Sequence, residues 1–204
     1  AYDGDLGPNT GGMGAISPAG VLTGKMVEKV MEKIILPTSR GMVTEGRPFV
    51  GVLYAGLMID GDDAKVLEYN VRFGDPETQA LLMRLKTDIV EIFDAAITGD
   101  LDKVSMTWDP RHAVCVVMAA QGYPGDCRKG AVISGLDEAG DLPDTFVFHA
   151  GTKLVDGDVT TNGGRVLGVT ALGSDAGSAI KNVYDAVSKI SFEGGFFRKD
   201  IGSK

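Results

Sequence analysis

Residues 65–79 read Lys65-Val-Leu-Glu-Tyr-Asn-Val-Arg-Phe-Gly-Asp-Pro-Glu-Thr-Gln79, and this stretch decides how the rest of the chain is interpreted. Apolar and polar residues alternate up to Phe73. A strand turns successive side chains to opposite faces, so the alternation predicts a β-strand over 65–73. The apolar set is expected to pack inward: Leu67, Tyr69, Val71 and Phe73. The other face then carries a carboxylate, an amide and a guanidinium, from Glu68, Asn70 and Arg72.

The polar face of this strand has the chemistry of a metal and anion site. Residues two apart on a strand lie roughly 7 Å apart at Cα, so Glu68 and Asn70 could hold one hard cation or two adjacent ones. Oxygen ligands of this kind suit Mg²⁺, which normally keeps waters and substrate phosphates as its other ligands. Arg72, one step further along the same face, would bind a phosphate or a carboxylate through its planar fork.

The strand is expected to stop at Gly74, which permits a turn. Asp75 is a good N-cap, and Pro76 suits the first position of a helix. An edge strand with a solvated polar face, followed by a capped helix, explains the same residues without any binding site. The alternation alone leaves both interpretations open.

The first 20 residues contain six glycines and two prolines, which predicts a long loop. Long irregular loops in compact domains tend to be functional or disordered. Consecutive glycines such as Gly11 and Gly12 let backbone N–H groups approach an anion closely. Composition alone supports a flexible terminus as much as an anion-binding loop.

Four separate blocks of the sequence carry a family resemblance. Residues 68–79 closely resemble the signature of the phosphoribosylamine–glycine ligases, also called glycinamide ribonucleotide synthetases, within the ATP-grasp enzymes. Three further blocks match the same family in the same order, at Asp3–Gly14, Gln121–Asp126 and Thr161–Leu167. The likeness runs from near Asp3 to Gly202. It identifies the chain with the carboxyl-terminal half of that family.

The resemblance implies roles for particular residues. Glu68 and Asn70 would bind the metal, and Arg72 would be the catalytic residue that meets the carboxylate or the transferring phosphoryl group. The glycine-rich block would lie near glycine and the phosphates, with substrate-binding positions at Asp5, Asn9, Thr10, Gly11, Gly12 and Met13. Asp3 matches a second acidic position of that block, while Leu6 stands where the family usually has threonine.

Two implied positions have equally good structural explanations. Leu57 matches a position that often touches the adenine ring, so it would bind the nucleotide, but a simple core residue is at least as good an interpretation. Arg165 would contact nucleotide or substrate, and a structural salt link between domains explains it as well. The block Phe196–Gly202 is expected to dock onto the first domain.

The implied reaction joins glycine to 5-phosphoribosylamine with ATP, through a glycyl phosphate, and gives glycinamide ribonucleotide, ADP and phosphate in de novo purine biosynthesis. Mg²⁺ or Mn²⁺ would be the cofactor, and the expected partners are these three substrates, with no nucleic acid and no membrane. The protein would be a cytoplasmic monomer or weak dimer. Two alternatives stay open: another ATP-grasp carboxylate–amine ligase, and a non-catalytic binding module.

The predicted elements define an α+β fold, in which the second lobe of an ATP-grasp domain, an antiparallel sheet with helices, precedes a small β-rich domain with one packed helix. The expected domains are 1–99 and 100–204, divided at Gly99-Asp100. In the first we expect a helix from Thr23 to about 35 that Pro37 ends, and strands over 49–60 and 65–73 joined by a turn at 61–63. A helix over 76–85 should follow, and then a second helix that Thr87 or Asp88 caps and that runs to about Thr98. In the second we expect strands over 113–119, 146–151, 158–161 and 165–172, and a helix capped by Asp175.

Composition limits the remaining options. The net charge of −8 disfavours binding to nucleic acid, and no apolar run approaches the ~20 residues of a membrane helix. The chain begins without Met, in what should be a loop, which suggests a fragment that lacks the family's first lobe and has no ligase activity alone.

His112 is expected at the surface and His149 in a structural hydrogen bond. Cys115 should be a buried thiol, and a disulfide to Cys127 has little support.

Overall fold

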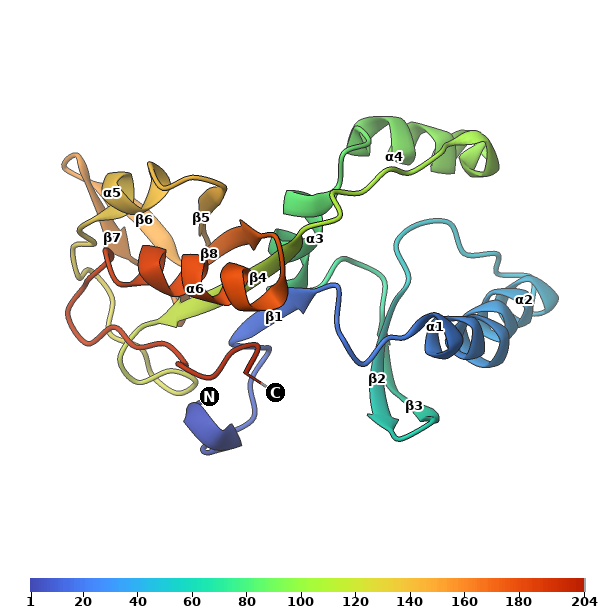
Figure 1. The fold of residues 1–204 in the computed structure, drawn as a ribbon, viewed down its shortest axis with the longest axis horizontal. Coiled ribbons are helices and arrows are strands. Elements are labelled where there is room, and N and C mark those ends of the chain that lie inside the picture. Colours follow the sequence, from blue (N-terminus) through green and yellow to red (C-terminus); the bar gives the residue numbers. More distant parts are fainter. Residues whose placement is uncertain (204) are drawn as a thin grey trace. The chain divides into compact units, whose positions relative to one another are not determined.

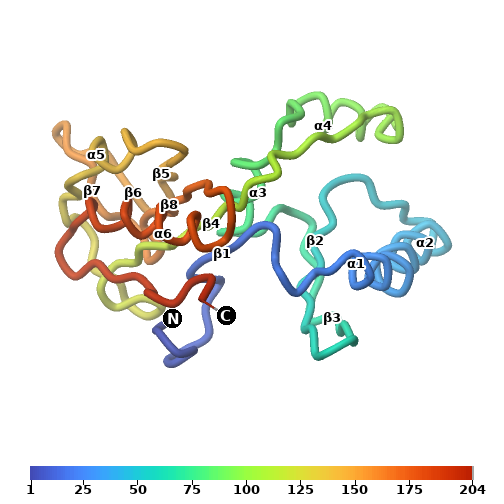
Figure 2. The backbone as a smooth tube through the Cα atoms, in the orientation of Figure 1, coloured from blue at the N-terminus to red at the C-terminus, as the bar shows by residue number. Residues whose placement is uncertain are grey.

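The computed structural model describes residues 1–203 (Figure 1, Figure 2). Contacts divide the chain into two compact units built from interleaved segments. The first unit contains Ala1–Ser17, Asp75–Arg84 and the chain from Asp109 onwards, and the second contains Pro18–Gly74 and Leu85–Trp108. The units are thus discontinuous in sequence, and the division predicted at residues 99 and 100 stays a prediction about domain limits.

The first unit is organised around a four-stranded antiparallel sheet with the order β1-β4-β8-β5 (Figure 1). Its strands are β1 (Gly14–Ser17), β4 (His112–Ala119), β8 (Arg165–Gly173) and β5 (Thr145–His149). The two central strands are almost wholly buried, as expected of continuous apolar runs rich in valine. The strands predicted near 113–119, 146–151 and 165–172 are confirmed.

Helices cover both faces of this sheet. On one face, alternate residues of β4 such as Val114 and Val116 pack with Val183 and Val187 of α6 (Ala176–Val187). On the other face, Cys115 packs with Ala80 and other residues of α3 (Glu77–Arg84). The two-residue period of the strand therefore separates two apolar layers, and both layers are part of the core.

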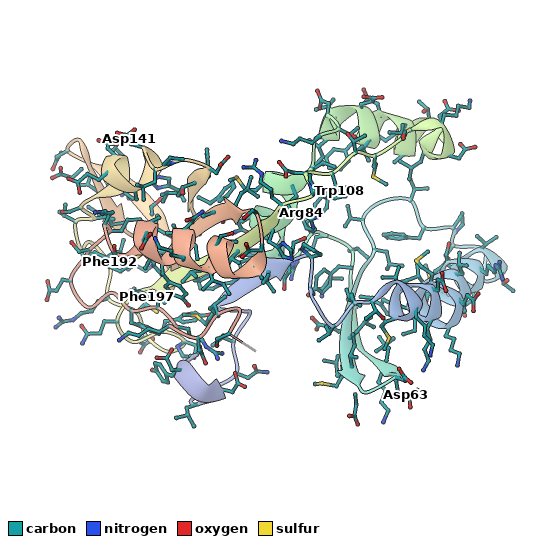
Figure 3. All side chains as sticks on the ribbon, in the orientation of Figure 1. Asp63, Arg84, Trp108, Asp141, Phe192 and Phe197 are labelled. Carbon is teal, nitrogen blue, oxygen red and sulfur yellow. The ribbon has the colours of Figure 1, made fainter. Side chains whose placement is uncertain are left out.

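The helix α6 begins with a capping box. The side chain of Asp175 accepts a hydrogen bond from the Ser178 backbone N–H at 2.8 Å, and the Ser178 hydroxyl meets the Asp175 backbone N–H at 3.1 Å. This confirms the cap predicted from the sequence. Beyond α6, Phe197 lies near Tyr184 with 6.3 Å between ring centroids, and Phe192 joins the same core cluster (Figure 3).

Four elements of the first unit were not predicted: a 3₁₀ turn over Asp3–Asp5, β1, β6 (Thr152–Val155) and α5 (Leu136–Gly140). The ribbon of β6 with β7 (Asp158–Thr161) is antiparallel, and β7 itself confirms the predicted strand at 158–161. The prediction of a continuous loop over residues 1–20 is wrong at β1. Ala15 there pairs with Cys115, because the short apolar run Ala15-Ile16 can complete the edge of the sheet.

The second unit begins with one helical stretch that continues past its proline. Thr23 caps α1 (Gly24–Val30) by accepting a hydrogen bond from Met26, as predicted. A π-helical turn over Met31–Ile35 then leads into α2 (Leu36–Thr44), so the prediction that Pro37 ends the helix is wrong. The π-turn places Pro37 in the first turn of α2, where its missing N–H donor is not required. The Thr38 hydroxyl donates a hydrogen bond to the Ile34 backbone carbonyl at 2.7 Å.

The strands β2 (Tyr54–Asp60) and β3 (Asp63–Asn70) form a hairpin with its turn at residues 61 and 62. The hairpin is confirmed, but both strands are shorter than predicted, and β3 ends at Asn70. Of the four apolar residues predicted to pack inward, three do not: the exposed fraction is 63% for Leu67 and 73% for Val71, which lies beyond β3, and Tyr69 is also exposed. Phe73 is half-buried, and its ring centroid lies 6.3 Å from that of Phe93. Glu68 lies opposite Gly56, and Val66 lies opposite Leu57, so Leu67 is an extra residue in a bulge that interrupts the alternation.

The second unit also contains α4 (Ile89–Thr98) and a short 3₁₀ turn over Leu101–Lys103. Asp88 caps α4, since its side chain accepts a hydrogen bond from the Val90 backbone N–H at 2.8 Å. Gly99 ends the helix in the left-handed conformation with φ 79°. Both ends agree with the predicted helix over 88–98. None of the helices in the described part of the chain is long and apolar enough to cross a membrane.

Candidate functional site

The hairpin of the second unit brings Glu68 and Asn70 together on one side of β3. The Asn70 side-chain amide donates a hydrogen bond to Glu68 Oε1 at 2.9 Å. Opposite them in the ladder, a Cβ atom at Gly56 would lie 3.2 Å from Glu68 Cγ, so a glycine there leaves room for the Glu68 side chain. Glu68 is exposed and Asn70 is half-buried. The two residues therefore present their polar ends side by side to solvent.

This donor set fits a hard divalent cation. The hydrogen bond from the Asn70 amide nitrogen does not use the Asn70 carbonyl oxygen or the second Glu68 carboxylate oxygen, and Mg²⁺ prefers oxygen donors of these types. No group of three or more His, Cys, Asp or Glu side chains able to hold a metal occurs among residues 1–203. An ion at Glu68 and Asn70 would therefore take most of its ligands from waters or from phosphate oxygens.

Arg72 and Leu57 lie in the same unit. Arg72 follows the end of β3 by two residues, so it does not continue the strand face as predicted, and its guanidinium donates to the Phe73 carbonyl at 2.8 Å. Its side chain is exposed. Leu57 is half-buried in β2, next to the bulge. The catalytic role of Arg72 and the nucleotide-binding role of Leu57 stay predictions.

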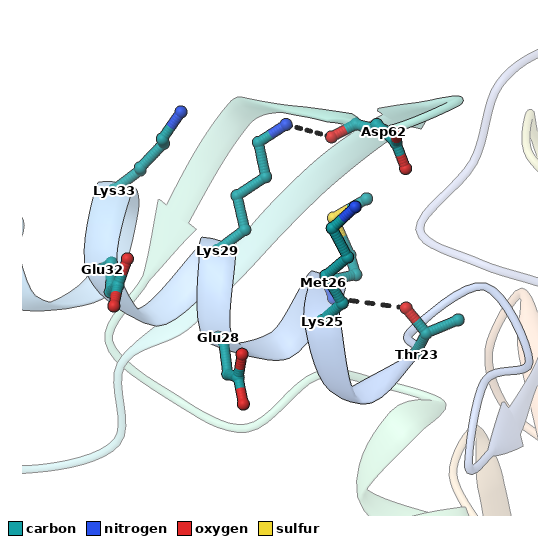
Figure 4. Close-up of a pocket in the computed structure, with 8 residues that line it drawn as sticks. All are labelled: Thr23, Lys25, Met26, Glu28, Lys29, Glu32, Lys33 and Asp62. Carbon is teal, nitrogen blue, oxygen red and sulfur yellow. Dashed lines mark hydrogen bonds between the residues drawn. The ribbon is translucent and has the colours of Figure 1, made fainter.

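The pocket in Figure 4 has a volume of about 330 Å³ and lies between α1 and the turn of the hairpin. Lys29 closes it by donating hydrogen bonds to the Asp62 carbonyl and, at 2.9 Å, to the Asp63 carboxylate. The hydrogen bond and the charge of Lys29 hold the pKa of Asp63 below its ordinary value. These contacts fasten the hairpin to α1, so they support the element that carries Glu68.

The first unit contains the glycine-rich block, and its acidic end is tied to the carboxyl-terminal segment. Arg198 forms two hydrogen bonds of 2.7 Å with the Asp200 carboxylate and a third of 2.9 Å with Asp5. Asp3 accepts a hydrogen bond from the Lys199 backbone N–H, and Gly4 donates one to Asp200. The expected docking of 196–202 onto the first domain is therefore confirmed at these residues.

The other end of the block meets Arg165. The Arg165 guanidinium donates to the carbonyls of Gly11 and Gly12 at 2.9 and 3.1 Å. Met13, the next residue, is buried, and its carbonyl accepts a hydrogen bond from the Val117 backbone N–H. Between the two ends, Asn9 is exposed and Thr10 is half-buried. The structure thus brings Arg165 to the substrate-side residues predicted from the sequence.

The sequence patterns gave no site role to Asp75, although it lies in the stretch Lys65–Gln79. Its carboxylate accepts from Arg165 at 2.9 Å through one oxygen and from the Gln79 amide at 3.2 Å through the other. Its backbone carbonyl also accepts from Arg165. The signal that could have found it is the Asp-Pro-Glu-Thr-Gln run, which is part of the family signature over residues 68–79 but was given only a helix-capping role.

The histidines and cysteines show no catalytic arrangement in the described residues. His149 shares a hydrogen bond of 3.1 Å with the Thr152 hydroxyl, as expected of a structural residue. His112 is half-buried and its Nδ1 is buried without a partner, so placing it at the surface is wrong. Both cysteines are free thiols, and burial raises the pKa of Cys115 to about 12. A thiol with that pKa is not a nucleophile at neutral pH.

Two family models match the chain. The model described as phosphoribosylglycinamide synthetase, ATP-grasp (A) domain, matches residues 1–78, which contain Glu68 and Asn70. The model described as phosphoribosylglycinamide synthetase, C domain, matches residues 113–204. The class defined by the fold and the site is therefore an ATP-grasp segment followed by the C domain of the same family.

The sequence comparisons identify the family within this class. A phosphoribosylamine–glycine ligase of Pseudomonas aeruginosa is 56% identical over 201 residues, which are 98% of this chain and 47% of the relative. One from Rhodopirellula baltica is 53% identical over 205 residues, with 100% and 47% covered. The chain belongs to the phosphoribosylamine–glycine ligase family, as the resemblance predicted, and corresponds to its carboxyl-terminal half. It spans about half the length of the curated relatives it matches.

Solved structures agree with this assignment. The crystal structure of a phosphoribosylamine–glycine ligase from Thermotoga maritima matches with a TM-score of 0.86 at 36% identity, over 98% of this chain and 49% of that one. The biotin carboxylase domain of a Hydrogenobacter thermophilus 2-oxoglutarate carboxylase matches with a TM-score of 0.63 at 15% identity, over 91% and 40%. The second likeness concerns the fold alone. The predicted α+β class with an antiparallel ATP-grasp sheet is confirmed.

Proposed function

We propose that the intact protein is an ATP-dependent ligase that joins glycine to 5-phosphoribosylamine and gives glycinamide ribonucleotide, ADP and phosphate. The observation that carries the proposal is the paired Glu68 carboxylate and Asn70 amide, 2.9 Å apart on β3, within the segment that matches the ATP-grasp model. The names of relatives at 53–56% identity support the choice of substrates. By this proposal the enzyme acts in purine biosynthesis, in the cytoplasm, as a monomer or weak dimer.

Glu68 and Asn70 would hold Mg²⁺, or Mn²⁺, together with the phosphates of ATP. The ion supplies positive charge that neutralises phosphate oxygens during transfer. Arg72 would add a guanidinium at the glycine carboxylate or the transferring phosphoryl group, which requires its side chain to leave the Phe73 carbonyl. Leu57 would contact the adenine ring. Such chemistry depends on positioning and charge rather than on a covalent nucleophile of the protein.

The glycine-rich block would bind the substrates. Asn9 and Thr10 supply polar side chains, and Gly11 and Gly12 supply backbone close to a ligand. Met13 has its side chain in the core, so its part would be to fix the end of the block. Asp5 is held by Arg198, so any contact of Asp5 with substrate would use a carboxylate whose charge is already compensated.

The test uses the longest natural protein that contains this chain. We expect Glu68→Ala to abolish metal-dependent turnover, and Glu68→Gln to lower kcat/KM by about 100-fold or more, because it removes the charge of the pair but keeps its shape. Glu28→Gln, an exposed carboxylate on α1, is the matched control and should retain wild-type rates. ADP formation is measured at several Mg²⁺ concentrations. Near-normal activity of Glu68→Ala would exclude the metal role.

Two further measurements separate this proposal from its alternatives. A screen of carboxylic acids and amines would favour another ATP-grasp ligase if a different pair replaced glycine and phosphoribosylamine. Calorimetry with Mg·ATP would favour a non-catalytic module if the intact protein bound none. The 204-residue chain alone should release no phosphate when given all three substrates, and release at a rate near that of the intact protein would contradict this.

A further inference from the structure

We propose that Arg165 is a positioning residue, which fixes the substrate-side glycine loop against the Asp75–Pro76 turn and does not itself contact substrate. The inference rests on the proposed function only for the naming of the substrates. The geometry that supports it, the joining of Gly11, Gly12 and Asp75 through one guanidinium, lies wholly within the first unit.

The backbone that carries Arg165 is held firmly at the start of β8. Arg165 pairs with Ala119 of β4, and its carbonyl accepts a hydrogen bond from the Gly151 N–H at 3.0 Å. Glycines allow this close packing: a Cβ at Gly164 would lie 2.4 Å from the Tyr123 ring, and one at Gly151 would lie 2.7 Å from the Cα of Gly163. The side chain of Arg165 therefore extends from a fixed base.

The guanidinium of Arg165 is engaged by the protein at both of its terminal nitrogens. One terminal nitrogen donates to the carbonyls of Gly11, Gly12 and Asp75, at 2.9, 3.1 and 2.6 Å. The other donates to the Asp75 carboxylate at 2.9 Å, and the exposed fraction of the side chain is only 22%. These contacts use both N–H groups of one terminal nitrogen and one N–H of the other, which leaves at most two of the five guanidinium donors for a substrate phosphate. This arrangement favours a positioning role over direct binding.

The glycines of the loop have the geometry that such a contact requires. Gly12 has φ +104°, a conformation that other residues rarely adopt, and a Cβ there would lie 2.9 Å from Pro76 Cδ. A Cβ at Gly11 would lie 3.4 Å from a terminal nitrogen of Arg165. The loop thus lies directly on the guanidinium and on the Pro76 ring.

The contact at Arg165 completes a loop that is anchored at both ends. The first anchor joins Asp5 to Arg198, and the second joins Gly11 and Gly12 to Arg165. Asn9, an exposed side chain, lies between them. Fixing both ends before substrate arrives lowers the conformational entropy that binding must overcome, so Arg165 would raise affinity for the loop's substrate.

The experiment compares three variants of the longest natural protein that contains this chain. Arg165→Gln removes the fork and the charge, and Arg165→Lys keeps the charge without the planar fork. The matched control is Arg128→Gln, because Arg128 pairs only across the surface with Glu193 in the same unit. Hydrogen exchange of the amides of residues 9–14 is measured without substrate, with the amides of β4 as an internal reference for the stability of the fold.

We expect Arg165→Gln to speed exchange of the loop amides by about tenfold or more while the β4 amides stay within about twofold of wild type. KM for glycine or phosphoribosylamine should rise about tenfold, with little change in kcat or in KM for ATP. Arg165→Lys should give an intermediate loss, and Arg128→Gln none. Addition of guanidinium at millimolar concentration should partly restore loop protection in Arg165→Gln.

Two outcomes would overturn the proposal. Loop amides that stay protected in Arg165→Gln would show that the residue does not fix the loop. Protection that stays normal while kcat/KM falls would mean that Arg165 binds substrate directly. The exchange measurement needs no turnover, so it distinguishes this proposal from the ligase activity: a wild-type protein without that activity would refute the proposed function and leave the loop measurement interpretable.

Discussion

Gly173 is a residue of the first unit at which a single added methyl group should lower the stability of the fold. It ends β8 opposite His112, directly beneath the first turn of α6. A Cβ there would lie 2.2 Å from the Ala179 backbone nitrogen and 2.6 Å from the Ala179 Cα. Both are backbone atoms of a helix fixed by its capping box, so they cannot move aside as a side-chain tip could. Gly173→Ala must lift α6 from the sheet.

The magnitude follows from overpacking of a buried site. Insertions of this kind typically cost 1–3 kcal/mol, and a clash with helix backbone belongs at the upper end, about 3 kcal/mol. Native-state hydrogen exchange of the β4 amides reports that loss directly. At about 1.4 kcal/mol for each factor of ten, we expect exchange to accelerate by about 100-fold.

The matched control is Gly140→Ala at the end of α5, where an added Cβ would meet nothing within 4 Å. Its effect should stay within about 0.5 kcal/mol, as for ordinary surface substitutions. If the β4 amides of Gly173→Ala exchanged within twofold of wild type, α6 would not pack on β8 as closely as described here. Equal acceleration in both variants would also refute the reasoning, because the control carries no clash.

Two other predictions concern the buried thiol and a helix cap. Burial raises the pKa of Cys115 to about 12 from 9.0, so its contribution to stability is complete below about pH 9 and is lost as pH rises towards 12. Cys115→Ala should therefore flatten the alkaline fall in unfolding free energy, and thiol reagents at pH 8 should label Cys127 first; equal labelling rates would contradict the burial. Thr23→Ala should cost α1 about 1 kcal/mol, seen as faster exchange of its amides, while Thr23→Asp keeps the cap; equal exchange in both would exclude a role of the side chain.

The central part of the first unit was predictable, because its strands β4 and β8 are buried on both faces. Runs such as Ala113–Ala119 need apolar residues at every position, and the sequence shows them directly. The Asp175 cap was equally visible, since a capping residue acts within its own turn. The strand β1 was not visible: it is four residues long, lies in a glycine-rich segment, and forms only because β4 offers an edge about 100 residues later in the chain.

The second unit shows where local patterns mislead. The alternation of β3 predicted one buried face, but the bulge at Leu67 changes the register, and no third strand pairs with the hairpin in the described residues. Pro37 predicted a helix end, but the π-turn before it removes the need for its missing N–H. In both cases a local change in backbone hydrogen bonding, the bulge in β3 or the π-turn before α2, overrides the pattern of apolar residues. Hydrophobic periodicity alone does not reveal such a change.

The candidate site residues make contacts of both kinds, some that a local sequence pattern predicts and some that it cannot. The pairing of Glu68 with Asn70 follows from their spacing on one strand, so the sequence predicts it without tertiary information. The contacts of Arg165 join segments 90 and 154 residues apart, and no local pattern could have paired them. The family resemblance implied that Arg165 contacts nucleotide or substrate. A structural salt link explained the residue equally well. The geometry favours the second, since a side chain that holds two glycine carbonyls and an aspartate prepares the loop on which substrate would then bind.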